Sequence, residues 1–160
     1  MDIFDFAIEK EKEAEKYYRE IAEFVSDKGL SRILTMLADE EVKHRKILEE
    51  MKTRSPAIAE TDILKDVKNV FVQFKDEKDS FNPNISQIDM YKKAQERERQ
   101  SMDFYQEKSD EVELPEQKEL LVKMAGEEKR HFFILENIID FVSRPETWLE
   151  NAEFNRLEEY

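Results

Sequence analysis

The chain has 160 residues, with 39 acidic and 26 basic side chains and a net charge of −13 at neutral pH. This length suits one domain with its own core, and the acidic balance disfavours a nucleic-acid partner. The absence of cysteine excludes disulfides and thiolate metal sites and is compatible with a cytoplasmic protein. No apolar stretch is long enough to cross a membrane, and the N-terminus lacks the basic region of a signal peptide, so we expect no membrane partner.

A first helical hairpin is predicted over about residues 2–52. Apolar residues recur at spacings of three and four from about residue 2 to 25, and again from about residue 30 to 52. The break between the two helices falls at Ser26-Asp27-Lys28-Gly29, where Gly29 is suited to a positive φ. Such a short connection implies that the two helices are antiparallel neighbours.

Residues 53–86 are predicted as a crossover that connects the first hairpin to the second. A short helix is predicted within it over 61–75, with an apolar face of Ile63, Val67, Val70, Phe71 and Phe74. One long crossover between two helical hairpins distinguishes the ferritin-like bundle from a simple up-and-down bundle.

A second hairpin follows over about residues 87–142. Its first helix is expected to begin after Ser86, with Asp89 completing a partial capping box, and its second helix to begin at Pro115. Residues 143–160 are predicted as a short amphipathic helix packed on the bundle or on a second subunit. The sequence therefore predicts an all-α, ferritin-like four-helix bundle that forms a single domain over 1–160.

The two hairpins are related by a fixed offset of 87 residues, since residues 7–51 align with 94–138 without a gap. Each of the two histidines closes the same motif, Glu41-Val42-Lys43-His44 and Glu128-Lys129-Arg130-His131. A further glutamate stands 30 residues before each motif, at Glu11 and Glu98. Two unrelated amphipathic hairpins would share leucines by chance. Chance similarity does not explain why the only two histidines of the chain fall at equivalent positions of the repeat.

These positions suit a dinuclear metal site. A Glu-x-x-His pair projects a carboxylate and an imidazole from one helix face, and two such pairs with two single glutamates make a di-iron or di-manganese ligand set. Two divalent cations cancel the charge of four carboxylates, which could not remain ionised together without partners. Carboxylates with imidazole favour iron or manganese, whereas zinc would bind without redox chemistry. The predicted ligands are the terminal Glu11 and Glu98, the bridging Glu41 and Glu128, and the capping His44 and His131.

Other polar residues near these motifs have less specific readings. Lys12, Lys43, Arg97 and Arg130 could pair with the glutamates, but their helical phase points them outward. Glu40 and Glu127, which precede the bridging pair, lie about 100° from their neighbours on the helix. We expect both of them to be solvated and do not assign them as ligands.

Tyr18 and Tyr105 stand two helical turns after Glu11 and Glu98 on the same face. Each phenol could hydrogen-bond a ligand carboxylate of the other hairpin, or could be an ordinary buried tyrosine. Ala14 and Ser101 are small and could leave room for the cluster or for an oxidant.

These motifs resemble the rubrerythrin branch of the ferritin-like superfamily. Its members carry Glu-x-x-[Ala/Gly/Ser]-x-x-x-Tyr on helices 1 and 3, matched here by Glu11 to Tyr18 and Glu98 to Tyr105, and Glu-x-x-His on helices 2 and 4. The likeness covers about Asp2 to Val142. It implies a di-iron centre with two iron ions per subunit, a homodimer, and reduction of hydrogen peroxide to water.

The chain departs from the family pattern in two ways. It has no cysteines for a C-terminal rubredoxin domain, so electrons would come from an external donor protein. Gln95 stands where many members have an extra glutamate that takes part in the peroxidase cycle. The remaining symmetric Glu₄His₂ set also resembles the ferroxidase centre of bacterioferritins. Reduction of peroxide or O₂, iron handling, a non-redox structural metal site and oxygenase chemistry therefore all stay open at this point.

Overall fold

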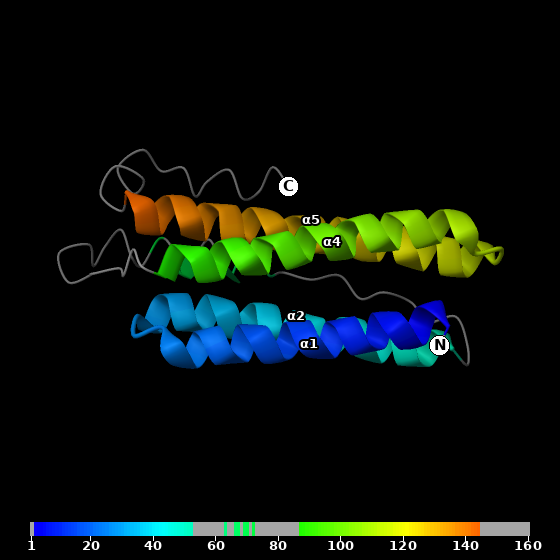
Figure 1. Cartoon of the computed structure of the whole chain (residues 1–160), viewed down its shortest axis with the longest axis horizontal. Coiled ribbons are helices and arrows are strands. Elements are labelled where there is room, and N and C mark those ends of the chain that lie inside the picture. The colour runs from blue at the N-terminus through cyan, green and yellow to red at the C-terminus, as the bar shows by residue number, and fades with distance from the viewer. Residues whose placement is uncertain are drawn as a thin grey trace.

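The computed structural model describes residues 2–52 and 87–144, together with 63, 66, 67, 69, 70 and 72. The described residues form four long helices, α1 (Ile3–Phe24), α2 (Lys28–Met51), α4 (Ile88–Glu111) and α5 (Pro115–Ser143), and contain no strand (Figure 1). The prediction of an all-α, ferritin-like four-helix bundle is confirmed. None of these helices is both long and apolar enough to span a membrane. The predicted C-terminal helix within 143–160 falls almost wholly outside the described residues.

The helix starts follow local capping chemistry. Asp2 accepts a hydrogen bond from the backbone N–H of Asp5, and Asp27 accepts one from Leu30, each at 2.9 Å. The prediction that Gly29 ends a break with a positive φ is wrong, because the Asp27 cap starts α2 earlier and places Gly29, buried, in its first turn.

The second hairpin begins and ends close to the predicted positions. Pro115 occupies the first turn of α5, where its missing N–H leaves no hydrogen bond unmade. Gln87 precedes α4 without a side-chain cap, and the predicted cap Ser86 lies outside the described residues.

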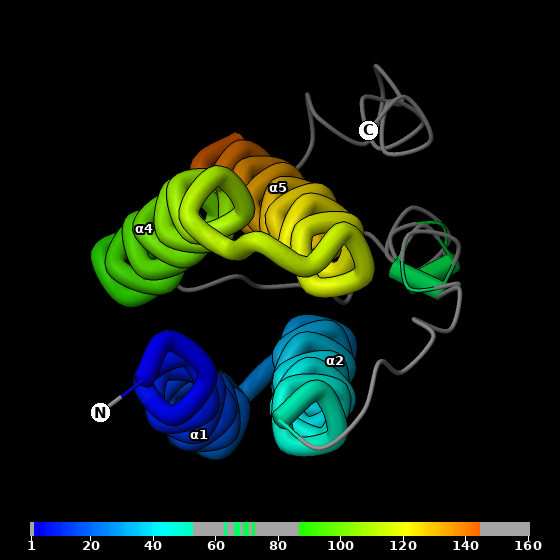
Figure 2. Tube along the Cα trace, turned by 90° about the vertical axis from the view of Figure 1, so that its right-hand side faces the viewer, coloured from blue at the N-terminus to red at the C-terminus, as the bar shows by residue number. Residues whose placement is uncertain are grey.

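The two hairpins stack face to face, as the end view of Figure 2 shows. Within each hairpin the helices pack closely together, and between hairpins α1 contacts α4 and α2 contacts α5. In the crossover, Ile63, Val67 and Val70 are helical and buried against the core, as the sequence predicts. Phe71 and Phe74 of the same predicted face are not among the residues whose side chains the structure describes.

The core consists of two apolar clusters with a polar layer between them. One cluster includes Tyr18 and Ala38, and the other includes Ile8 and Leu48. Along α1, Glu11 follows Ile8 and precedes Tyr18, and along α2 the Glu-x-x-His motif lies between Ala38 and Leu48. The packing of the four helices therefore places the motif residues at one level, enclosed by apolar side chains at both ends.

We expect Asp27→Ala to lower the free energy of unfolding by about 1 kcal/mol, because the N–H of Leu30 loses its acceptor. Urea unfolding followed by circular dichroism would measure the loss. Ser26→Ala, at an exposed neighbouring position, is the control. An equal loss in both variants would contradict the capping role.

Candidate dinuclear metal centre

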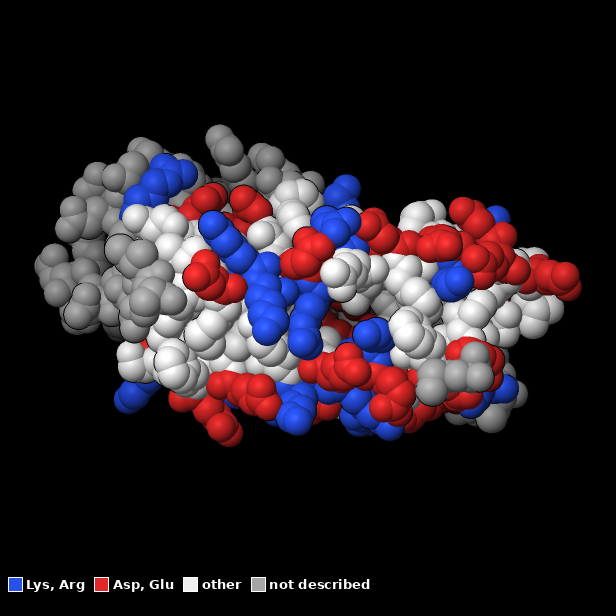
Figure 3. Space-filling model, viewed as in Figure 1, with Lys and Arg blue, Asp and Glu red and all other residues white. Residues whose placement is uncertain are grey.

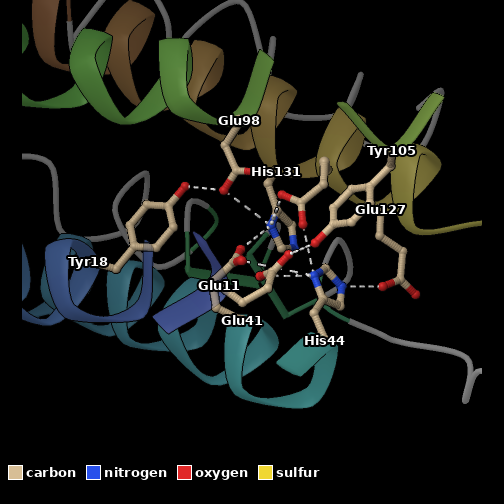
Figure 4. A network of polar contacts seen from close by, with 9 residues as sticks. Glu11, Tyr18, Glu41, His44, Glu98, Tyr105, Glu127 and His131 are labelled. Atoms are coloured by element: carbon tan, nitrogen blue, oxygen red, sulfur yellow. Dashed lines mark hydrogen bonds and ion pairs between the residues drawn. The ribbon is translucent and has the colours of Figure 1, made fainter. Parts of the chain in front are cut away.

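All four helices contribute to one buried polar cluster at the middle of the bundle (Figure 4). Each of its six predicted ligands is at most 3% exposed. In α2 and α5 the glutamate and histidine of each motif lie three residues apart on the same face. The six residues are Glu11 from α1, Glu41 and His44 from α2, Glu98 from α4, and Glu128 and His131 from α5.

The cluster divides into two overlapping groups of potential metal ligands. Within each group, one ligand atom from every residue lies within 4.8 Å of the others. Glu41 and Glu128 belong to both groups, whereas each group has its own histidine and its own single glutamate. The first group adds Glu11 and His44, and the second adds Glu98 and His131. This sharing is the arrangement expected if Glu41 and Glu128 bridge two metal positions.

Each histidine contacts a carboxylate of the opposite hairpin. His44 Nδ1 lies 2.8 Å from Glu128 Oε1, and His131 Nδ1 lies 2.9 Å from Glu41 Oε1. The two imidazole rings stack with centroids 5.6 Å apart and planes 9° from parallel. Both Nδ1 atoms thus face the carboxylates, which is the orientation required of a pair of ligands.

Burial and the close approach of the ionisable groups shift the pKa values of all four carboxylates in the cluster. Burial, followed by repulsion from neighbouring carboxylates, raises the pKa of Glu41 and of Glu128 well above the usual value. Burial also opposes ionisation of Glu11, but a hydrogen bond with Glu41 and the charge of His44 lower its pKa to about 2. Glu98 has a lowered pKa in spite of burial, because of the charge of His131 and a hydrogen bond with Glu128.

Two buried oxygens in the cluster have no hydrogen-bond partner among the described residues. They are Glu11 Oε2 and Glu98 Oε2, which come from the two predicted terminal ligands. Buried polar atoms are almost always paired, so a carboxylate oxygen without a hydrogen-bond partner beside an imidazole is suited to bind a cation. The donors are all carboxylate oxygen and imidazole nitrogen, a set that suits iron or manganese. The residues present therefore fit a metal at each group.

Both tyrosines hydrogen-bond across the hairpin interface. Tyr18 donates its phenol proton to Glu98 Oε1, and Tyr105 donates to Glu11 Oε1. These are the contacts that the two-turn spacing suggests, between each phenol and the single glutamate of the other hairpin. Burial and then the neighbouring carboxylates raise the pKa of both phenols well above 10.0, so each remains a donor. Each bond orients one oxygen of its carboxylate and leaves the other free for a metal.

The expectation that Glu40 and Glu127 are solvated is wrong, because both are buried. Glu127 contacts His44 Nε2, the ring nitrogen that points away from the cluster. Burial opposes its ionisation, but the hydrogen bond with His44 lowers the pKa of Glu127. Glu40 forms a third potential ligand group with His44 and His131 and pairs with Lys43 at 3.5 Å.

The prediction from helical phase failed for a geometric reason. A side chain about 100° around the helix from Glu41 or Glu128 still faces a neighbouring helix where α2 and α5 meet. The repeat carried the missing signal, since 127 − 40 is also 87. A carboxylate on the outer nitrogen of a ligand histidine fixes the tautomer and the ring orientation.

The alternative that basic residues neutralise the cluster finds no support in the contacts of Lys12 and Lys43. Lys12 pairs with Glu9 at 3.1 Å, and Lys43 pairs with Glu40. Both lysines are exposed on the outside of the hairpin, as their helical phase predicts.

The chain matches a family model and is similar in fold to a solved structure. The family model for rubrerythrin matches residues 2–139. A solved structure, a hypothetical protein from Pyrococcus furiosus, superposes with a TM-score of 0.64 at 20% sequence identity, covering 88% of each chain. This likeness bears on the fold alone. No curated protein sequence matches the chain.

We expect Glu127→Ala to weaken metal binding about 10- to 100-fold, because His44 loses the carboxylate that orients its ring. Competition between the protein and a chromophoric chelator for Co²⁺ would measure the change. Glu119→Ala, an exposed position on the same helix, is the control. Equal affinities of the two variants would show that Glu127 does not support the site.

Metal binding is expected to release protons and to strengthen as the pH rises. The raised pKa values of Glu41 and Glu128 make these groups keep their protons to higher pH than an ordinary glutamate, and a ligand carboxylate must lose its proton. Acid therefore competes with the metal. Calorimetric titration with Zn²⁺ in two buffers of different ionisation enthalpy would detect the released protons, and identical heats in both would contradict the expectation.

Proposed function

From its membership of the rubrerythrin family, to which this chain belongs, we propose that the protein is a di-iron enzyme that reduces hydrogen peroxide or O₂. The observation that supports this most directly is the pair of ligand groups that share Glu41 and Glu128. Two metal ions per chain, with iron preferred over manganese, would then occupy them. When bound, such a pair of irons supplies the two electrons that a peroxide O–O bond takes up on reduction.

The surrounding residues would hold the centre and handle protons. Reduction of one hydrogen peroxide to two waters consumes two electrons and two protons. Tyr18 and Tyr105 keep their protons and direct them at Glu98 and Glu11, so they orient these carboxylates without adding charge. The apolar clusters at both ends separate the site from bulk water, which strengthens every electrostatic interaction within it.

The electrons would come from a separate donor protein, because this chain has no cysteine to bind an electron-transfer iron. We propose a cytoplasmic homodimer, in keeping with the reducing conditions that a cysteine-free chain tolerates.

Iron oxidation for storage is the second candidate, and the position of Gln95 favours it. Gln95 Nε2 lies 3.4 Å from the carbonyl oxygen of Phe132 and also contacts the carboxylate of Glu136. The amide is thus directed along α5, and this position adds no fifth carboxylate to the centre. The resulting symmetric ligand set is the kind that oxidises iron as a substrate.

The metal content of protein purified without added metal is the first test. We expect two irons per chain by mass spectrometry, with near-ultraviolet absorption from an oxygen-bridged ferric pair. Zinc alone, unchanged after reconstitution with iron, would instead indicate a structural metal site and would contradict both redox proposals.

Activity separates the two redox proposals. We expect the reduced, iron-loaded protein to consume peroxide at least about 100-fold faster than Glu128→Ala, since that variant lacks a carboxylate common to both ligand groups. Glu119→Ala controls for the loss of a surface carboxylate. Equal rates in the wild type and Glu128→Ala would contradict peroxide reduction.

Size-exclusion chromatography with light scattering gives the assembly. A dimer without a mineral core would exclude storage, whereas a large hollow assembly that retains added iron would favour it over peroxide reduction.

A further inference from the structure

A cavity of about 430 Å³ lies between α1 and α4, on the face of the molecule that Figure 3 shows. Its walls combine the aromatic rings of Phe6 and Phe104 with the cations Lys10 and Arg97. We propose that this cavity binds a small organic carboxylate with an apolar body. Sites for small organic ligands typically span about 300–1,000 Å³, whereas one water occupies about 30 Å³ in the liquid. The cavity is thus far larger than hydrogen peroxide requires.

The internal repeat shows that the cavity is particular to one side of the centre. The offset of 87 residues places Lys93 at the position equivalent to Phe6, and Phe104 at the position equivalent to Tyr17. On the Tyr17 side, Lys93 Nζ and Arg97 Cζ lie 5.8 and 4.6 Å from the centre of the Tyr17 ring. The Tyr17 phenol is itself bonded to the carbonyl of Met90 at 3.1 Å.

These contacts fill the second side almost completely. The cavity that remains there has a volume of about 10 Å³, no more than one water needs. The two sides are related by the internal repeat and have equivalent backbone positions. The difference in cavity volume between them therefore comes from the side chains on the walls.

The charges on the walls select an anion. Lys10 is paired at 3.5 Å with Glu13, a carboxylate that also lines the cavity, so Arg97 supplies the net positive charge of the walls. Arg97 stacks on Tyr17, and no carboxylate pairs with it in the part of the chain that the structure describes. An arginine fork matches a carboxylate with two parallel hydrogen bonds. On a chain with a net charge of −13, a cavity wall with an unpaired guanidinium is a local exception that would attract an organic anion.

The aromatic walls select an apolar body for that anion. The rings of Phe6 and Phe104 lie 5.1 Å apart at 41°, and Phe6 is 40% exposed. A ligand that covers these rings would remove apolar surface from water. An acid with an aromatic or short aliphatic group would therefore satisfy both walls at once, which inorganic anions would not.

The cavity also reaches the residues that hold the metal centre. Tyr105 lines it, and the phenol of Tyr105 donates to Glu11. Ala14, Arg97 and Ser101 line both cavities, and the smaller one extends to Glu98. A bound acid in the larger cavity would thus lie against Tyr105, which orients Glu11, and beside the small Ala14 and Ser101.

Calorimetric titration of the purified protein with phenylacetate tests the proposal. Phenylacetamide removes the charge and phenethylamine reverses it, while both keep the ring. We expect saturable binding of phenylacetate with one site per chain. We expect the protein to bind the amide and the amine at least about tenfold more weakly than phenylacetate, since a hydrogen bond to a charged partner is lost.

Two matched variants locate the site. Arg97→Gln should weaken phenylacetate binding about tenfold or more, and Arg97→Lys should recover part of it. Lys93→Gln removes a cation from the same ring of Tyr17 but lies outside the larger cavity, so it should leave the affinity within about twofold. Circular dichroism of each variant would establish that it is folded.

Three outcomes would overturn the proposal. They are the absence of saturable binding by phenylacetate, binding of the amine as tight as that of the acid, and equal effects of Arg97→Gln and Lys93→Gln. Carboxylate binding directly to a metal would persist in Arg97→Gln and would change the optical spectrum, which also contradicts the assigned site. None of these results bears on whether the centre reduces peroxide, because the readout is binding and not turnover.

Discussion

The burial of four carboxylates and two imidazoles in the middle of an apolar bundle is the constraint on which the rest of this structure depends. Taking such groups from water costs several kcal/mol for each ion that lacks a partner, so the cluster exists only with compensation. Hydrogen bonds from Tyr18 and Tyr105 and the histidine contacts supply part of it, and the raised pKa values of Glu41 and Glu128 favour their neutral forms. Glu11 Oε2 and Glu98 Oε2 accept no hydrogen bond from the described residues, and they are where a metal ion would add most.

Several contacts of the cluster join the two hairpins. His44 reaches Glu128, His131 reaches Glu41, and each tyrosine reaches the single glutamate of the opposite hairpin. Neither hairpin holds a complete group by itself, since both groups need Glu41 and Glu128 together. Metal binding and docking of the hairpins would therefore stabilise each other, as expected when ligands from separate elements meet only in the folded state.

The repeat matches throughout the polar centre and differs at some positions around it. The ligands, the tyrosines and the outer pair Glu40 and Glu127 keep the same register in both halves. Outside this layer, Phe6 and Lys93 occupy equivalent positions with opposite chemistry, which leaves one side open and the other filled. The two metal positions of this chain have matching ligands, one histidine and one single glutamate each with two shared glutamates. A substrate or ligand approaches from one direction, and its site has no reason to be symmetric.

The fold class and the six candidate ligands could be read from the sequence, because helical periodicity and a repeated Glu-x-x-His motif are local patterns with few alternatives. The start of α2 was misjudged because the Asp27 cap outweighs the local preference of Gly29 for a turn. Glu40 and Glu127 were misjudged for a different reason: their helical phase does not reveal which neighbouring helix covers them. Their burial depends on tertiary packing, as the contact between Glu127 of α5 and His44 of α2 shows. The cavity likewise depends on the separation of α1 from α4 and on side chains from both, which no single segment of the chain encodes.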